Sequence, residues 1–161
     1  MNQATGKPDI TLSHPRNDIR LSFPDSTVLS GPVGVSLESF VQAWQAHTEH
    51  KFPPVTAALL NGVLHELTYI PEHDASVTPL DICTVDGMRV YKRSLSLVLV
   101  TAANRLFPEA HINIDHSITA NGYFCEMRGR PPLTKEEVIT LETEMKRLVQ
   151  ASLPIIKKRM S

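Results

Sequence analysis

The stretch YKRSLSLVLVTAANRLFPEAHINIDHSITANGYFCEM, from Tyr91 to Met127, decides the fold of the second half of the chain. Its run from Leu95 to Ala103 is apolar except at Ser96 and Thr101, and the spacing predicts a helix from about Val90 to Leu106. Because such a helix is apolar on most of its faces, we expect other elements to cover it.

A hairpin and a further helix are predicted after this first helix. Residues 110–118 alternate between polar and apolar side chains, and residues 122–127 form the partner strand across Ala120-Asn121-Gly122. Thr134 and Glu137 have the spacing of a capping box, which begins a helix that ends before Pro154. The apolar face predicted for that helix consists of Val138, Leu141, Met145, Leu148 and Val149. Ile155-Ile156 is predicted to begin a last strand.

The first half of the chain predicts a small α+β module of five strands and one helix. The predicted strands are residues 18–23, 27–35, 55–60, 63–67 and 76–83. Ser36 can cap a helix after the second strand, and Asn61-Gly62 favours a tight hairpin because a type I′ turn needs positive φ at both positions. Pro79 restricts the last strand to a sheet edge or a strand start. Asp86-Gly87 predicts a turn between the two modules.

Composition and charge fit a folded protein of one domain or two small ones. The 161 residues are 42% hydrophobic, and the net charge of -1 provides no overall field for nucleic acid or an anionic membrane. Residues 128–161 carry 8 Lys/Arg against 4 Asp/Glu, so this end is basic. A solvated helix face and a binding patch both account for that bias.

Cysteine use and hydropathy predict a cytoplasmic protein without membrane contact. Cys83 and Cys125 are the only cysteines, which is no disulfide framework, so free thiols are expected. The amino terminus lacks the pattern of a signal peptide, and the longest apolar run is far shorter than the roughly 20 residues that cross a bilayer.

Two blocks of the sequence resemble known domains. Residues 18–84 contain IRLSFPDST, AALLNGVLHEL and ASVTPLDIC, and they resemble a TGS domain, the β-grasp (ubiquitin-like) module of threonyl-tRNA synthetases, some GTPases and stringent-response synthetases. Residues 86–161 resemble the editing domain that follows TGS in threonyl-tRNA synthetase, through the Leu106-Phe107-Pro108 helix end and the 120–125 hairpin. The polar residues 1–17, which include Pro8 and Pro15, are predicted to be a loose lead-in segment. The resemblance implies a TGS-like domain at 18–84 and an editing-like domain at 86–161 that is truncated at its C-terminus.

The departures from the editing domain predict that its hydrolytic chemistry is lost. In the family, two helix histidines line the pocket that hydrolyses mischarged seryl-tRNA, and the resemblance places Ser94 and Val98 at their positions. A valine cannot donate, accept or relay a proton. The family's later Cys-x-x-x-His pair would lie beyond Ser161. We therefore expect no catalytic residue, no cofactor and no metal ligand in this chain.

The second domain also resembles the amino-terminal region of bacterial uridine kinase-like nucleoside kinases. MRVYKRSLSLVL at 88–99 and NGYFCEM at 121–127 carry this resemblance, which implies a non-catalytic regulatory region that binds nucleotide or RNA next to an attached kinase. No phosphate-binding G-x-x-x-x-G-K-[ST] sequence occurs, so ATP and Mg are expected only in a kinase domain outside this chain. A tRNA-binding or residual editing module and a protein-interaction module using a β-grasp edge are the alternatives.

Six residues around the helix and the hairpin are the candidates for a binding pocket: Lys92, Arg93, Ser94, His116, Tyr123 and Cys125. Lys92 and Arg93, together with Arg128 and Arg130, could hold a phosphate or a tRNA end, or could be solvated surface charges.

His116 and Cys125 are predicted to lie on neighbouring strands and could face one another near Ser94. A thiolate–imidazole pair would be a nucleophile, whereas the alternative is a packed thiol beside a hydrogen-bonded histidine. A metal site at His111, His116 and Cys125 is disfavoured because alternation places the two histidines on opposite faces of the strand.

Overall fold

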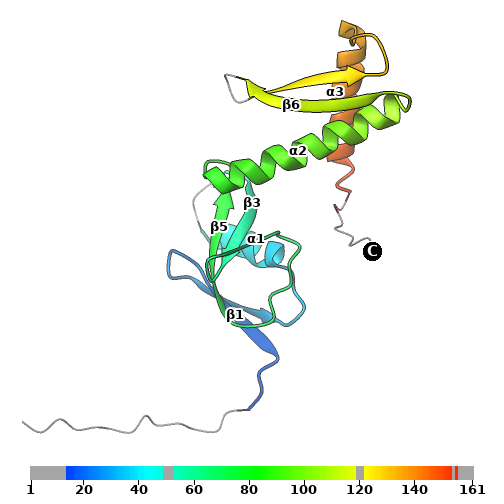
Figure 1. The fold of residues 1–161 in the computed structure, drawn as a ribbon. Helices are drawn as coiled ribbons and strands as arrows, with labels where there is room; N and C mark the ends of the chain where they lie inside the picture. The colour runs from blue at the N-terminus through cyan, green and yellow to red at the C-terminus, as the bar shows by residue number, and fades with distance from the viewer. Residues whose placement is uncertain (1–13, 49–52, 119–121, 154, 156–161) are drawn as a thin grey trace, which may run out of the picture. The chain divides into compact units, whose positions relative to one another are not determined.

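The computed structural model describes residues 14–48, 53–118, 122–153 and 155, without the side chains of 116–118 (Figure 1). The chain divides into two compact units, Met1–Gly87 and Met88–Ser161. Both combine helix and strand, so the predicted α+β class is confirmed. In the described part of the chain, no helix combines the length and the apolarity that crossing a bilayer requires.

A mixed five-stranded sheet and one helix build the first unit (Figure 1). The strands are β1 (Asp18–Ser22), β2 (Val28–Pro32), β3 (Val55–Leu60), β4 (Val63–His65) and β5 (Ala75–Asp81), and the helix is α1 (Leu37–His47). The sheet order is β2-β1-β5-β3-β4, with β1 and β5 parallel and the other neighbours antiparallel. This arrangement is compatible with a β-grasp-like module.

Short-range signals account for the helix start and the hairpin of this unit. The Ser36 hydroxyl accepts a hydrogen bond from the Ser39 N–H at 3.4 Å, which caps α1 as predicted. Asn61 and Gly62 have φ of 48° and 83°, as the β3–β4 turn requires. The apolar face of α1 packs with the sheet in one buried core that contains Ile19, Leu21, Phe23, Leu37, Phe40, Val41, Trp44, Ala58, Leu60 and Val77.

The position of β5 corrects the prediction made from Pro79. β5 lies inside the sheet, between β1 and β3, and is not an edge strand. Pro79 is tolerated because β1 pairs with β5 at Ala75 and Ser76, before the strand reaches the proline. The other side of β5 pairs with β3, where Ala58 lies opposite Pro79. An interior strand can therefore hold a proline where one of its two neighbours has ended.

The predicted turn at Asp86-Gly87 is wrong, because both residues lie in the first turn of α2 (Val85–Leu106). The turn occurs earlier, where the Asp81 carboxylate accepts from the N–H groups of Cys83 and Thr84 at 2.9 and 3.2 Å. The Thr84 hydroxyl then accepts from the Gly87 N–H at 3.1 Å, which is a helix-capping bond.

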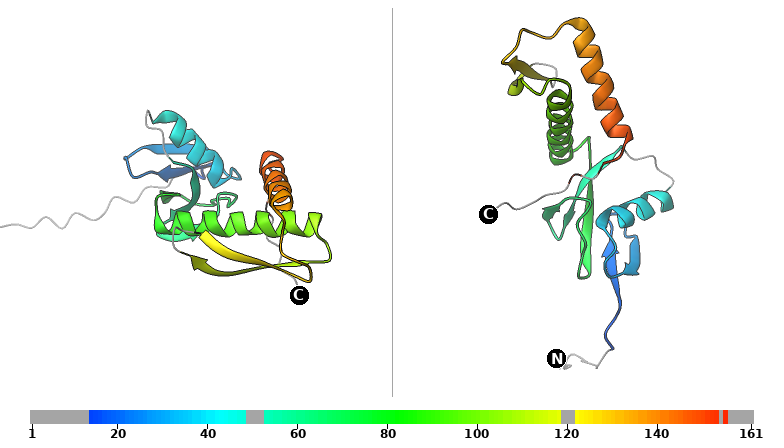
Figure 2. Two further views of the ribbon diagram at one scale, coloured as in Figure 1. Left: turned by 90° about the horizontal axis from the view of Figure 1, so that it is seen from above. Right: turned by 90° about the vertical axis from the view of Figure 1, so that its right-hand side faces the viewer.

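The second unit consists of α2, a hairpin and a further helix. The hairpin strands are β6 (His111–Ile118) and β7 (Gly122–Arg128), and the helix is α3 (Lys135–Gln150). The hairpin runs along α2 (Figures 1 and 2). Ala102 and Ala103 of α2 form a buried core with Leu141 and Leu148 of α3. The capping box of Thr134 and Glu137 is present as predicted.

Two expectations about apolar faces are corrected in this unit. Leu95 and Leu97 of α2 are exposed, so α2 is not covered on all its apolar faces. Val138 and Val149 of α3 are also exposed. The buried residues of that helix are Leu141 and Leu148, and Met145 is partly buried. The strand predicted at Ile155-Ile156 lies partly outside the described residues.

Candidate ligand-binding groove

A groove of about 340 Å³ lies between α2 and the β6–β7 hairpin. It brings together three of the six predicted pocket residues: Lys92, Tyr123 and Cys125. The other lining residues are Met88, Tyr91, Leu95, Ser96, Leu99, Ile114, Gly122 and Met145. The groove is thus apolar over most of its surface, with one ammonium, two phenols, one hydroxyl and one thiol. Its volume is in the range of small-ligand sites.

Lys92 and Tyr123 form the polar feature of this groove. The Lys92 Nζ lies 5.9 Å from the centre of the Tyr123 ring, within the distance of a cation–π contact. Tyr123 is 42% exposed, so part of the residue is accessible to a ligand. The pair therefore offers an aromatic surface and a positive charge side by side.

The sulfur of Cys125 is poorly suited to be a nucleophile. Cys125 is exposed, yet the neighbouring atoms desolvate its thiol enough to raise its pKa, which favours the protonated form near neutral pH. The strand register places Ile114, and not His116, opposite Cys125, and the pairing shifts only beyond this pair, between Ile114 and Ser117. His116 is therefore not the residue directly opposite Cys125 on the neighbouring strand, and the His116 side chain itself lies outside the described part of the structure.

Ser94 and Arg93 do not line the groove. The Ser94 hydroxyl donates to the Val90 carbonyl one turn earlier, at 3.0 Å. Arg93 is exposed on α2. Both residues thus remain untested predictions as ligand contacts.

The two arginines after the hairpin are held by acidic partners. The Arg128 Nε lies 3.2 Å from Glu126, on the same strand. Arg130 pairs with Glu137 of the capping box at 2.6 Å, and its guanidinium lies 4.3 Å from the centre of the Phe107 ring. The Arg130–Glu137 ion pair therefore links the segment after β7 to the start of α3. Neither arginine lines the groove.

The apolar lining was missed as a binding feature, although the sequence contains a signal for it. Met88, Leu95 and Leu99 recur along α2 at helical spacing with Tyr91 and Lys92, which places them on one face. That spacing indicates a shared face but cannot show whether protein or ligand covers it. The distinction comes from the hairpin, which covers one side of the face and leaves a gap.

The described side chains include no group of three or more His, Cys, Asp or Glu that could hold a metal ion. The sequence of α2 contains no histidine between Val85 and Leu106. The lack of an imidazole on this helix therefore does not depend on how it is aligned with an editing domain.

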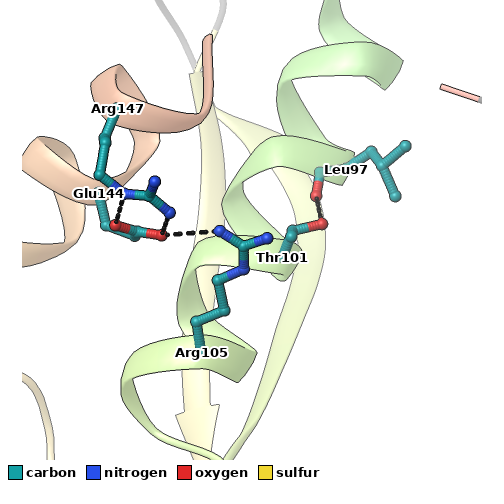
Figure 3. Close-up of polar contacts among 5 residues, drawn as sticks. All are labelled: Leu97, Thr101, Arg105, Glu144 and Arg147. Carbon is teal, nitrogen blue, oxygen red and sulfur yellow. Dashed lines mark hydrogen bonds and ion pairs between the residues drawn. The ribbon is translucent and has the colours of Figure 1, made fainter. Parts of the chain in front are cut away.

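A second polar cluster joins α2 to α3 (Figure 3). Glu144 accepts from the Arg147 Nε and Nη2 at 2.7 and 2.8 Å, and from the Arg105 Nη1 at 3.2 Å. These hydrogen bonds, first those from Arg147, lower the pKa of Glu144 to about 2. Glu144 therefore remains ionised at any pH near neutral.

Glu144→Gln is expected to lower the free energy of unfolding at pH 7. In acid the variant and the parent chain should become equally stable. A carboxylate whose folded pKa lies below its unfolded value stabilises the fold above the unfolded pKa, and this contribution is lost as pH falls toward the folded pKa. The difference between the two proteins should therefore shrink from about pH 4.5 toward pH 2. Urea denaturation at several pH values measures it, with the exposed Glu109→Gln as control. A difference independent of pH would contradict the ion-pair account.

The sequence of the chain is similar to part of several threonine–tRNA ligases. The chain matches no family model. It is 34% identical to the threonine–tRNA ligase of Mycobacterium leprae (strain TN) over 90 residues, which are 56% of this chain and 13% of that protein. The chain is similar to part of a tRNA ligase. The ligase of Bacillus velezensis (strain DSM 23117 / BGSC 10A6 / LMG 26770 / FZB42) is 27% identical over 143 residues, 89% of this chain and 22% of the relative. The threonine–tRNA ligase of Clostridium perfringens (strain 13 / Type A) is 28% identical over 143 residues, which are 87% of this chain and 21% of that protein.

These matches span between 13% and 22% of the length of the relatives. They fit the predicted resemblance to the TGS and editing-like region of threonyl-tRNA synthetases. The synthetase-like alternative is thus better supported than a kinase regulatory region, for which the matches provide no evidence.

Proposed function

We propose that the chain is a tRNA-binding module of the threonyl-tRNA synthetase type that does not hydrolyse aminoacyl-tRNA. The similarity to threonine–tRNA ligases over as many as 143 residues carries this proposal. The groove between α2 and the hairpin is the proposed binding site, and the unpaired end of the tRNA is the proposed ligand.

The contacts of the groove suit the end of a nucleic acid strand. A base can stack on Tyr123 or lie against the apolar α2 face, and such stacking contributes about 1–3 kcal/mol for each base. The Lys92 ammonium beside Tyr123 can pair with a phosphate of the same nucleotide. One aromatic surface next to one cation therefore matches one nucleotide.

The described side chains of this lining include no group suited to activate water. Among the described residues that line the groove there is no histidine and no carboxylate. The Ser96 hydroxyl donates to the Lys92 carbonyl at 2.9 Å, and burial raises the pKa of the Cys125 thiol. General-base catalysis needs an acceptor with a suitable pKa within reach of the water. Binding without hydrolysis is thus the chemistry that this lining supports.

Lys92→Met is expected to weaken binding of uncharged threonine tRNA and to reduce its salt dependence. Loss of one phosphate contact to a single strand should reduce the slope of log affinity against log salt by about 0.7. Tyr123→Leu should weaken binding about tenfold through lost stacking. Fluorescence anisotropy over a salt series measures both changes. The matched control is Lys135→Met, an exposed lysine at the start of α3 outside the groove.

Equal losses for Lys92→Met and Lys135→Met would mean that the tRNA binds by overall charge and not in the groove. Absence of any tRNA binding by the full chain would refute the proposal. Release of serine from seryl-tRNA by the chain would instead indicate residual editing, which the groove lining does not support.

The kinase context stays a prediction with its own test. A P-loop sequence in the natural reading frame after Ser161 would support a regulatory region of a nucleoside kinase, and a synthetase core would support the tRNA proposal. Titration with nucleosides and nucleotides distinguishes the ligands, since a nucleotide-sensing region should bind a free nucleotide more tightly than it binds tRNA.

A further inference from the structure

A second groove of about 440 Å³ lies within the second unit, between α2 and α3. Its lining residues are Leu97, Val98, Thr101, Arg105, Leu148, Val149, Ser152, Leu153 and Ile155. The Thr101 hydroxyl donates to the Leu97 carbonyl at 2.8 Å, so it is already used within the helix (Figure 3). Arg105 is the one charged side chain among the described residues that line this groove, and most of the others are aliphatic.

The rim of this groove is unusually apolar for a surface. Leu97 is 46% exposed, Val149 61% and Ile155 58%, and Leu153 beside them is exposed as well. Contiguous exposed apolar side chains mark sites of association, whereas single ones are ordinary. A small ligand in a deep pocket is buried over most of its surface, whereas the rim side chains of this groove are themselves about half exposed. The groove therefore suits a segment of a macromolecule that lies along it.

Charge at one end of the groove indicates which segment fits. Arg147 and Arg105 share the single carboxylate of Glu144, and Arg147 makes two of the three hydrogen bonds (Figure 3). Two guanidinium groups against one carboxylate leave one excess positive charge. Arg105 uses one of its five N–H groups on Glu144 at 3.2 Å, and its side chain is 45% exposed, so it can donate to a second acceptor.

We propose that the α2–α3 groove docks an amphipathic helix of a partner protein, with an apolar stripe on Leu97, Val149 and Leu153 and an acidic side chain on Arg105. Helices that bind in grooves use anchors at i, i+3, i+4 and i+7, which form one apolar stripe. An arginine at the end of the stripe then selects a partner with Asp or Glu at the matching end. This site is separate from the proposed tRNA groove, with which it shares no lining residue.

The test uses a synthetic helical peptide with leucines at i, i+3, i+4 and i+7 and glutamates at one end. A matched peptide carries lysines in place of the glutamates. We expect the full chain to bind the acidic peptide saturably in fluorescence anisotropy, at least about tenfold more tightly than the basic peptide. Arg105→Glu should reverse this order of preference. Absence of saturable binding, or equal binding of the two peptides, would overturn the proposal.

A pair of variants on α3 locates the site. Val149→Asp places a charge on the groove rim and should weaken peptide binding about tenfold or more. Ile139→Asp is its matched control, since Ile139 is 63% exposed on the same helix and lines neither groove. Circular dichroism checks that both variants fold. Equal loss of binding in the two variants would overturn the assignment.

Sedimentation of the chain alone tests whether a second copy of the chain occupies the groove. A concentration-dependent dimer that Val149→Asp disrupts and Ile139→Asp retains would assign the groove to a second copy of the chain, and would refute the partner-helix proposal. A monomer that binds the acidic peptide is the expected result.

Discussion

Gly87→Ala is expected to destabilise the first unit by about 2 kcal/mol, although alanine is the better helix former. A Cβ at this position would lie 1.9 Å from the Asp81 carbonyl oxygen and 2.7 Å from the Thr84 hydroxyl oxygen. The Asp81 oxygen belongs to the backbone at the end of β5, so it cannot rotate away as a side chain would. In an exposed helix the same change gains about 1 kcal/mol. Overpacking of this kind costs about 1–3 kcal/mol and reverses the sign.

The matched control is Gly34→Ala, which isolates the backbone cost. Gly34 has φ of 98° and no heavy atom within 4 Å of a Cβ, so only the left-handed conformation penalises alanine, by roughly 1–2 kcal/mol. Urea denaturation followed by the fluorescence of Trp44, the sole tryptophan, reports on the first unit. If Gly87→Ala were as stable as the parent chain, the first turn of α2 could not lie against Asp81.

The comparison of these glycines shows what the sequence predicts well. Asn61-Gly62 needs only its own φ and ψ angles, and its turn was predicted correctly. Asp86-Gly87 has the same local signal, yet Gly87 is required for close approach to Asp81 and is helical. A dipeptide indicates that glycine is needed, but the contact that needs it lies six residues away. Short-range signals are therefore reliable where the cause itself is local.

Sheet order is a second property that local patterns cannot supply. The five strand positions and the single helix of the first unit were predicted, because each depends on alternation or capping within a few residues. The placement of β5 between β1 and β3 depends on pairing between residues more than 50 positions apart, such as Leu21 with Ala75. Pro79 can lie in this interior strand because β1 pairs with β5 only at Ala75 and Ser76, before the proline.

The candidate site was predicted in part, for the same reason. Lys92, Tyr123 and Cys125 meet in one groove because they lie on the helix face and the hairpin that the pattern identified. The possible pairing of His116 with Cys125 is absent because Cys125 lies opposite Ile114, and beyond that pair one extra residue on β6 shifts the register before Ser117. Alternation along one strand cannot reveal such a bulge, since it depends on how the partner strand pairs.

The acidic partners of Arg128 and Arg130 could not be predicted from the sequence either. Arg128 and Arg130 have the composition of a phosphate site, but Glu126 and Glu137 hold them. Glu137 is recognisable as part of a capping box, yet nothing in its spacing indicates that it also binds Arg130. These two arginines line neither groove, although the count of basic residues in 128–161 includes both.

Leu21→Ala is expected to lower the stability of the first unit by about 3 kcal/mol, within the range of 2–5 kcal/mol for buried leucines. Leu21 is fully buried in β1, which pairs with both β2 and β5, so no neighbouring strand can collapse freely into the space left behind.

The control for Leu21→Ala is Val28→Ala, on the adjacent strand β2. Val28 is 55% exposed, so its truncation should change stability by less than about 0.5 kcal/mol. Urea denaturation followed by Trp44 fluorescence compares the two variants. Similar small losses in both would mean that α1 does not close over the sheet at Leu21. A large loss confined to Leu21→Ala would place the main stabilising core of the unit between α1 and the central strands, where the buried residues are gathered.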